Sequence, residues 1–150
     1  MTVPNYHGHC FSSDEGKTWT QPQPMPKGMR SVLPRMAGLS DGTLLLSGGR
    51  PDVYLWVNPA GDARDWQQVD LLEHHNACLP QEPIRRLFDS NSGTYGYGST
   101  TAYTQMAVVD ESTVLLVYDR TPLTFPSPPA GSTDLQETYS CWAIRVSIAK

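Results

Sequence analysis

The sequence predicts an all-β fold, and its composition and punctuation support this. The 150-residue chain contains 12 glycines and 13 prolines, which break helices and favour turns. Short segments rich in Val, Leu, Thr and Tyr alternate with turn residues along the chain. Hydrophobic residues make up 39% of the chain, and a chain of this size buries about two thirds of its unfolded surface. We therefore expect one domain over residues 1–150.

The first pair of strands is expected within residues 31–57. Residues 43–47 follow the turn pair Asp41-Gly42, and residues 53–57 follow a segment that begins with two glycines. A second pair is expected at residues 101–109 and 113–118, joined by the polar turn Asp110-Glu111-Ser112. The second strand of this hairpin is nearly all apolar, which predicts that it is covered on both faces inside a stack of sheets.

The remaining segments are read as loops and one last strand. Residues 70–99 are polar and irregular, and residues 121–136 are rich in proline, so both are expected to form long surface loops. Residues 139–148 alternate between apolar and polar side chains, as a strand does. Arg145 lies in this strand, and a solvent-facing position is favoured over an inward functional one.

Charge and cysteine content exclude several classes of function. The chain has 15 acidic and 11 basic residues, a net charge of −4, so no nucleic-acid partner is expected. No apolar run approaches the roughly 20 residues of a membrane span, and the first residues lack the features of a secretory signal. Three cysteines with no C-x-x-C spacing predict buried free thiols and a lean towards the cytoplasm, while the compartment stays unassigned.

The histidines do not predict a metal site. His74 and His75 are adjacent, and His7 and His9 lie near Cys10, but neither cluster has the ligand spacing of a zinc site. His74 and His75 are read as loop residues. No metal and no cofactor are expected.

One short motif is specific. Ser12, Asp14, Gly16, Thr18 and Trp19 match S-x-D-x-G-x-T-W at every defined position. The motif predicts a hairpin turn in which the Asp14 carboxylate accepts backbone N–H bonds, Gly16 takes a positive φ and Trp19 packs into the sheet beneath. Its role is therefore structural.

This motif resembles the Asp box of the sialidase (neuraminidase) superfamily, which recurs between the outer strands of β-propeller blades. The strand, Asp-Gly turn and strand around residues 39–46, followed by Arg50, are also similar to that family. Asn58, Gly61 and Trp66 resemble a decayed second Asp box without an aspartate in register. The 47 residues from Trp19 to Trp66 are close to the length of one four-stranded blade.

The resemblance covers residues 6–66 and 100–120 and implies a partial β-propeller. At roughly 45 residues per blade, the chain would supply about three four-stranded antiparallel blades of a six-bladed fold, similar to its C-terminal half. The family's first arginine and its acid/base aspartate have no match in the sequence. Association with the missing blades or with another chain is therefore an open expectation.

The hairpin at 101–119 carries the catalytic part of the resemblance. Its segments are similar to the family's Ala-Tyr-Ser and Leu-Leu-Tyr-Glu stretches, which makes Tyr103 the implied nucleophile. Asp119 stands where the family has a glutamate that orients a substrate-binding arginine. Arg50 is the implied ligand of the substrate carboxylate, with a turn arginine as the structural alternative.

Three functions stay open from the sequence. The first is a sialidase-like glycoside hydrolase of the exo-α-sialidase type, incomplete in this chain, that acts on terminal sialic acid or a related acidic sugar. The second is a non-catalytic Asp-box propeller module that binds glycans or protein. The third is a structural fragment whose open sheet edges are capped by another chain.

Overall fold

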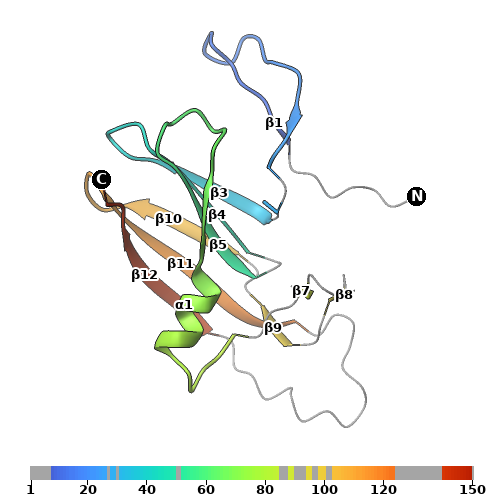
Figure 1. The fold of residues 1–150 in the computed structure, drawn as a ribbon, viewed down its shortest axis with the longest axis vertical. Helices are drawn as coiled ribbons and strands as arrows, with labels where there is room; N and C mark the ends of the chain where they lie inside the picture. The colour runs from blue at the N-terminus through green and yellow to red at the C-terminus, as the bar shows by residue number, and fades with distance from the viewer. Residues whose placement is uncertain are drawn as a thin grey trace. The chain divides into compact units, whose positions relative to one another are not determined.

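The computed structural model describes residues 8–26, 28–29, 31–49, 52–84, 88–89, 94–95, 98–100, 103–123 and 140–149. The chain divides into two compact units, Met1–Arg30 and Ser31–Lys150. The described part of the chain is mostly β with one short helix, which confirms the predicted class (Figure 1). Within this part the strands form separate antiparallel sheets, and no closed propeller is present.

Most strands belong to two meanders, and the rest form short ribbons. Their bounds are β1 Gly8–His9, β2 Gln23–Pro24, β3 Val32–Gly38, β4 Leu44–Gly49, β5 Val53–Asn58, β6 Gln67–Asp70, β7 Phe88–Asp89, β8 Thr94–Tyr95, β9 Gly98–Thr100, β10 Thr104–Val108, β11 Thr113–Leu123 and β12 Ser140–Ser147. β1 pairs with β2 in the first unit, and β7 pairs with β8 in the second. All pairings between these strands are antiparallel.

The first meander is a four-stranded sheet in the order β3-β4-β5-β6. Its first turn is held by Asp41, whose Oδ1 accepts the Thr43 N–H at 3.0 Å, while Gly42 takes a φ of 91°. The Leu39 N–H closes the turn on the Thr43 carbonyl at 2.9 Å. The predicted pairing of the strands around residues 43–47 and 53–57 is confirmed by the β4–β5 register.

The second meander runs in the order β10-β11-β12, with β9 paired to the far end of β11. The predicted hairpin is confirmed, since Thr104 lies opposite Tyr118 and Val108 opposite Val114. β12 pairs with β11 from Ser140 to Ser147 and alternates as predicted, with Arg145 exposed. β11 continues to Leu123, so residues 121–123 are part of a strand and not of the expected loop, and residues 124–136 lie outside the described part.

A helix, α1 (Leu71–Cys78), corrects the prediction of an irregular loop over residues 70–99. Asp70 caps its N-terminus, where Oδ1 accepts the Glu73 N–H at 2.9 Å. Leu71, Leu72 and His75 are buried and anchor the helix, although the residues between them are polar. Leu79 ends the helix directly before Pro80, a residue that disfavours helical geometry in its predecessor.

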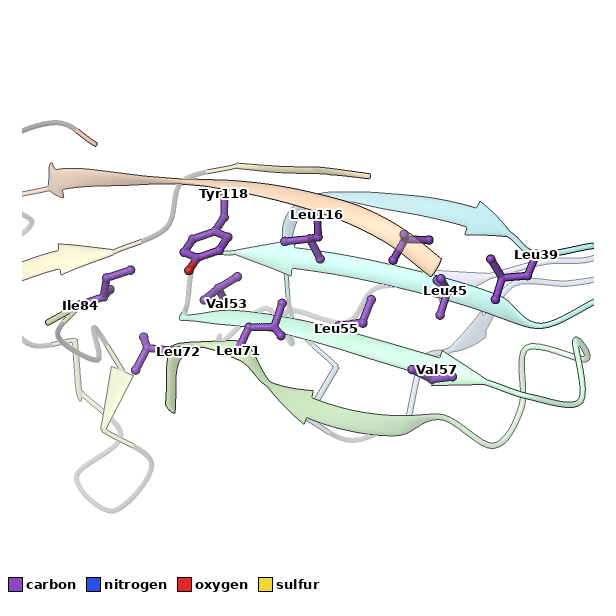
Figure 2. Packing of buried hydrophobic residues seen from close by; sticks show 11 residues of the cluster. Leu39, Leu45, Val53, Leu55, Val57, Leu71, Leu72, Ile84, Leu116 and Tyr118 are labelled. Atoms are coloured by element: carbon purple, nitrogen blue, oxygen red, sulfur yellow. The ribbon is translucent and has the colours of Figure 1, made fainter. Parts of the chain in front are cut away.

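The hydrophobic core lies between the two meanders and under α1 (Figure 2). Tyr118 and Leu116 project from β11 towards Val53 and Leu55 of β5. The buried cluster consists of Leu39, Leu45, Val53, Leu55, Val57, Leu71, Leu72, Ile84, Val114, Leu116 and Tyr118. These residues come from both sheets and the helix, so one core holds the second unit together.

Burial along β11 corrects the expectation that this strand is covered on both faces. Val114, Leu116 and Tyr118 are buried in the core, whereas Leu115 and Val117 on the other face are only half-buried. The three cysteines are free, as predicted, but all three are exposed rather than buried. In the described residues, no helix is both long and apolar enough to cross a membrane.

Candidate functional site

The motif at residues 12–19 forms a turn organised by the carboxylate of Asp14. Asp14 Oδ1 accepts the Thr18 N–H at 2.9 Å and the Ser12 hydroxyl at 2.8 Å, while Oδ2 accepts the Thr18 hydroxyl at 2.6 Å. The Ser12 oxygen in turn accepts the Gly16 N–H at 2.7 Å, and Gly16 has a φ of 84°. The predicted hydrogen bonding and positive φ are both present.

The donors around Asp14 stabilise its charged form. The Thr18 hydroxyl contributes most, followed by the Thr18 N–H and the Ser12 hydroxyl, and together they lower the pKa of Asp14 from 3.8 to about 2. Trp19 departs from the prediction that it packs into a sheet. Its ring is 61% exposed, and its Nε1–H donates to the Gly16 carbonyl at 3.0 Å. The indole therefore closes the turn instead of anchoring it in a core.

A second turn of the same design joins β5 to β6. Trp66 Nε1–H donates to the Ala63 carbonyl at 3.0 Å, three residues earlier, as Trp19 does to Gly16. Ala63 takes a φ of 56°, and its N–H donates to Asn58 Oδ1 at 3.0 Å. Asn58 thus acts as Ser12 does in the first turn.

The second turn also contains a carboxylate, that of Asp62, which the spacing of the sequence motif did not predict. Asn58 Nδ2 donates to Asp62 Oδ1 at 3.0 Å, and the same oxygen accepts the Arg64 N–H at 3.0 Å. The Arg64 N–H and then the Asn58 amide lower the pKa of Asp62. When the two turns are aligned on Trp19 and Trp66, Asp62 lies one position later than Asp14. The correspondence of the two carboxylates is therefore visible in their hydrogen bonds and not in the sequence spacing.

Tyr103 and Asp119, the two catalytic candidates of the hairpin, are brought together by strand pairing. The Tyr103 N–H donates to Asp119 Oδ1 at 3.0 Å, and the Asp119 N–H donates to the Tyr103 carbonyl at 3.4 Å. The Tyr103 side chain is 49% exposed, directly before β10 begins. The main chain of Tyr103 is therefore fixed, while its ring stays accessible to solvent.

β11 pairs with β10 and, beyond it, with β9. Thr104 of β10 lies opposite Tyr118, and Thr100 of β9 lies opposite Thr121. Tyr103 directly precedes β10, at the end of its pairing with β11.

A buried hydroxyl pair lies next to Tyr103. The Ser47 hydroxyl of β4 and the Thr104 hydroxyl of β10 are 2.8 Å apart, and both residues are buried. Because the two strands belong to different meanders, this bond fixes one sheet against the other beside the candidate nucleophile. The sequence offered no signal for this pair.

His75 forms a second buried polar cluster. It is 1% exposed, its Nδ1 lies 2.8 Å from the Tyr118 hydroxyl, and its Nε2 lies 2.9 Å from the Glu82 carbonyl. A carbonyl only accepts, so Nε2 carries the proton, and in the neutral imidazole Nδ1 accepts the Tyr118 O–H. Burial, and then the nearby Cys78 thiol, raise the pKa of Tyr118 to about 12.

The His75 cluster corrects the expectation that His74 and His75 are loop residues. Trp142 of β12 packs edge-on against the His75 ring with centroids 5.1 Å apart. Both ring nitrogens of His75 are bonded within the protein, so the cluster stabilises the packing of α1 against β11. Among the residues that the structure describes, no group of three or more His, Cys, Asp or Glu side chains converges on a metal position.

Arg50, the candidate ligand of a substrate carboxylate, lies outside the described residues. Comparisons with protein-family models, curated proteins and solved structures found no match to this chain.

Proposed function

We propose that this chain contributes the nucleophile-bearing strands of a sialidase-like glycoside hydrolase. The substrate class is a terminal sialic acid or a related acidic sugar, Tyr103 is the nucleophile, and Arg50 binds the substrate carboxylate. The single observation that carries the proposal is the placement of Tyr103, whose ring is accessible while its main chain is held by Asp119. The acid/base residue and a further arginine would be residues other than Tyr103, Arg50 and Asp119.

The chemistry of the substrate explains why a tyrosine suits this position. A sialic acid carries a carboxylate on its anomeric carbon, which would repel the carboxylate nucleophile that most retaining glycosidases use. A neutral phenol avoids this repulsion, provided that a base removes its proton as the oxygen attacks the anomeric carbon. The glycosidic bond breaks in the same step, and the acid/base residue gives a proton to the leaving oxygen. An arginine can bind the substrate carboxylate through two parallel charge-assisted hydrogen bonds, the role assigned to Arg50.

The proposed enzyme is built as a β-propeller, and the two turns that resemble Asp boxes support this architecture. The turn at Asn58–Trp66 joins the third and fourth strands of the β3-β4-β5-β6 meander. The turn at Ser12–Trp19 has the same tryptophan-to-carbonyl closure, the same positive φ and the same polar bridge, and it joins β1 to β2. A repeated sheet unit with one turn design is typical of propeller blades.

The test is the hydrolysis of a fluorogenic sialoside by the intact protein and by its Tyr103→Phe variant. We expect the variant to lose at least about a hundredfold in kcat/KM, because the phenol oxygen forms the covalent intermediate. Tyr54→Phe is the matched control, since it also removes one tyrosine hydroxyl, which donates to Asp52 at 3.2 Å, and Tyr54 has no role in the proposed reaction. Equal rates for the chain and Tyr103→Phe would overturn the assignment of the nucleophile.

A parallel binding measurement separates catalysis from recognition. Saturation-transfer NMR with free sialic acid reports contact between the sugar and the chain without requiring turnover. Binding accompanied by hydrolysis that depends on Tyr103 supports the proposed enzyme. Saturable binding with no hydrolysis would favour the alternative, a non-catalytic Asp-box module that binds glycans.

A further inference from the structure

We propose that Asp119 is a positioning residue for Tyr103, and that its carboxylate holds the main chain from which the tyrosine ring is presented. The catalytic consequence of this role rests on the proposed function. The hydrogen bond itself is independent of that function and is tested separately. The resemblance implied that Asp119 orients an arginine, whereas the observed bond gives its Oδ1 atom a role towards the nucleophile's own main chain.

The side-chain bond lies at the end of the β10–β11 pairing. Thr104, the first residue of β10, lies opposite Tyr118, and Tyr103 directly precedes it. The Tyr103 N–H donates to the side chain of Asp119, at 3.0 Å from Oδ1. The Asp119 carboxylate therefore holds the main chain of Tyr103 at the start of the strand.

The bond is suited to fixing direction as well as position. A carboxylate acceptor gives a charge-assisted bond, roughly twice as strong as one between neutral groups. The Asp119 N–H also donates to the Tyr103 carbonyl at 3.4 Å. Asp119 therefore binds the N–H of Tyr103 through its side chain and the carbonyl of Tyr103 through its main chain. Behind them, the buried Ser47–Thr104 pair fixes the next residue to the neighbouring sheet. Tyr103 thus projects from a main chain that is held on two sides.

The first test measures solvent exchange of the Tyr103 amide proton by NMR on the full ¹⁵N-labelled chain. In Asp119→Ala this proton is expected to exchange about tenfold faster, because its acceptor is lost. In Asp119→Asn the rate should stay near that of the unmodified chain, because the amide Oδ1 accepts the same bond. An unchanged rate in Asp119→Ala would overturn the proposal.

Asp110→Ala is the matched control at the other end of the same hairpin. Asp110 Oδ1 accepts the Ser112 N–H at 3.0 Å, so the substitution removes a bond of the same type without touching Tyr103. We expect faster exchange at Ser112 and no change at Tyr103. Faster exchange at both positions would point to general loosening of the hairpin and would overturn a specific role for Asp119.

The second test measures sialoside hydrolysis in the same variants. Asp119→Ala is expected to lower kcat about tenfold with little change in KM, and Asp119→Asn to restore most of the rate. Loss of amide protection without loss of rate would overturn the positioning role. If Tyr103→Phe leaves hydrolysis unchanged, the proposed function fails, while the exchange data still report whether Asp119 holds the main chain of Tyr103.

Discussion

A single carboxylate organises the turn between β1 and β2. Asp14 is bonded by the Thr18 hydroxyl, the Thr18 N–H and the Ser12 hydroxyl, all of which favour the charged form. Its pKa is therefore lowered from 3.8 to about 2. A carboxylate with a lowered pKa stabilises the folded turn fully above the unfolded value, and this contribution is lost as the pH falls from 3.8 to about 2.

This account predicts the effect of removing the strongest donor. In Thr18→Val the hydroxyl is lost while the shape and the backbone N–H are kept, so the pKa of Asp14 should rise from about 2 towards 3.8. Carboxyl carbon shifts followed by NMR over an acid titration measure the midpoint. Thr20→Val is the control, since the Thr20 hydroxyl accepts the Phe11 N–H and is not among the groups that lower the pKa of Asp14. An unshifted midpoint in Thr18→Val would contradict the assigned cause.

Asn58 shows that one side chain can replace another in the same turn design. Its carbonyl oxygen accepts the Ala63 N–H, and its amide donates to Asp62 and to the Asp65 carbonyl at 2.9 Å. Ser12 achieves the corresponding pair of contacts with one hydroxyl that both donates and accepts. The amide reaches farther than the hydroxyl, and the carboxylate it holds is one position later in the motif.

At the scale of elements, α1 is joined to the second meander by the His75–Tyr118 bond. The helix has eight residues, and helices this short are marginal in isolation. Its stability therefore comes from packing, through Leu71 and Leu72 in the core and through the His75 ring between Tyr118 and Trp142. The helix and β11 should consequently unfold together.

Tyr118→Phe tests this connection. The substitution leaves the buried Nδ1 of His75 without its donor, which should cost about 1–3 kcal/mol in the free energy of unfolding. Chemical denaturation followed by tryptophan fluorescence measures the change. Tyr54→Phe, which loses a hydroxyl from a half-buried residue, should have a smaller effect. Equal stability of Tyr118→Phe and the unmodified chain would show that the bond does not join helix and sheet.

At the scale of the whole second unit, the two meanders share one hydrophobic core. Leu116 from β11 is fully buried opposite side chains of β5, and the Ser47–Thr104 hydroxyl pair joins the sheets near the same level. The opposite face of β11 is only half-buried at Leu115 and Val117. Stability of the unit therefore depends on one inter-sheet layer.

Leu116→Ala should destabilise the second unit by about 2–5 kcal/mol, because it opens a cavity between the sheets. Met36→Ala, on the exposed surface of β3, removes side-chain volume where no core is lost and should change stability by less than about 0.5 kcal/mol. Urea unfolding of both variants provides the comparison. Similar losses in the two variants would contradict a shared core between the meanders.

The parts of the fold that the sequence predicted are those with local signals. The β10–β11 hairpin was predicted because apolar runs flank a short polar turn, and the Asp41-Gly42 turn because both residues favour that geometry. α1 was missed because its buried residues, Leu71, Leu72 and His75, are interrupted by polar ones within a proline-flanked segment. The pairing of Tyr103 with Asp119 follows from the hairpin register, but the bond from the Tyr103 N–H to the Asp119 side chain needed the structure.

The sequence by itself determined the hydrogen bonding of the turns at Asp14 and Asp41 and the β class, because these depend on residues close together in the chain. Tyr103 and Asp119 became candidates through the resemblance of the hairpin segments. Only the tertiary structure decided which side chains are buried and which remain accessible. His75 lies in the core, Trp19 is exposed, and Ser47 meets Thr104 across two sheets. Each of these outcomes depends on how strands distant in sequence pair and pack, since burial and hydrogen bonding across sheets are properties of the assembled fold.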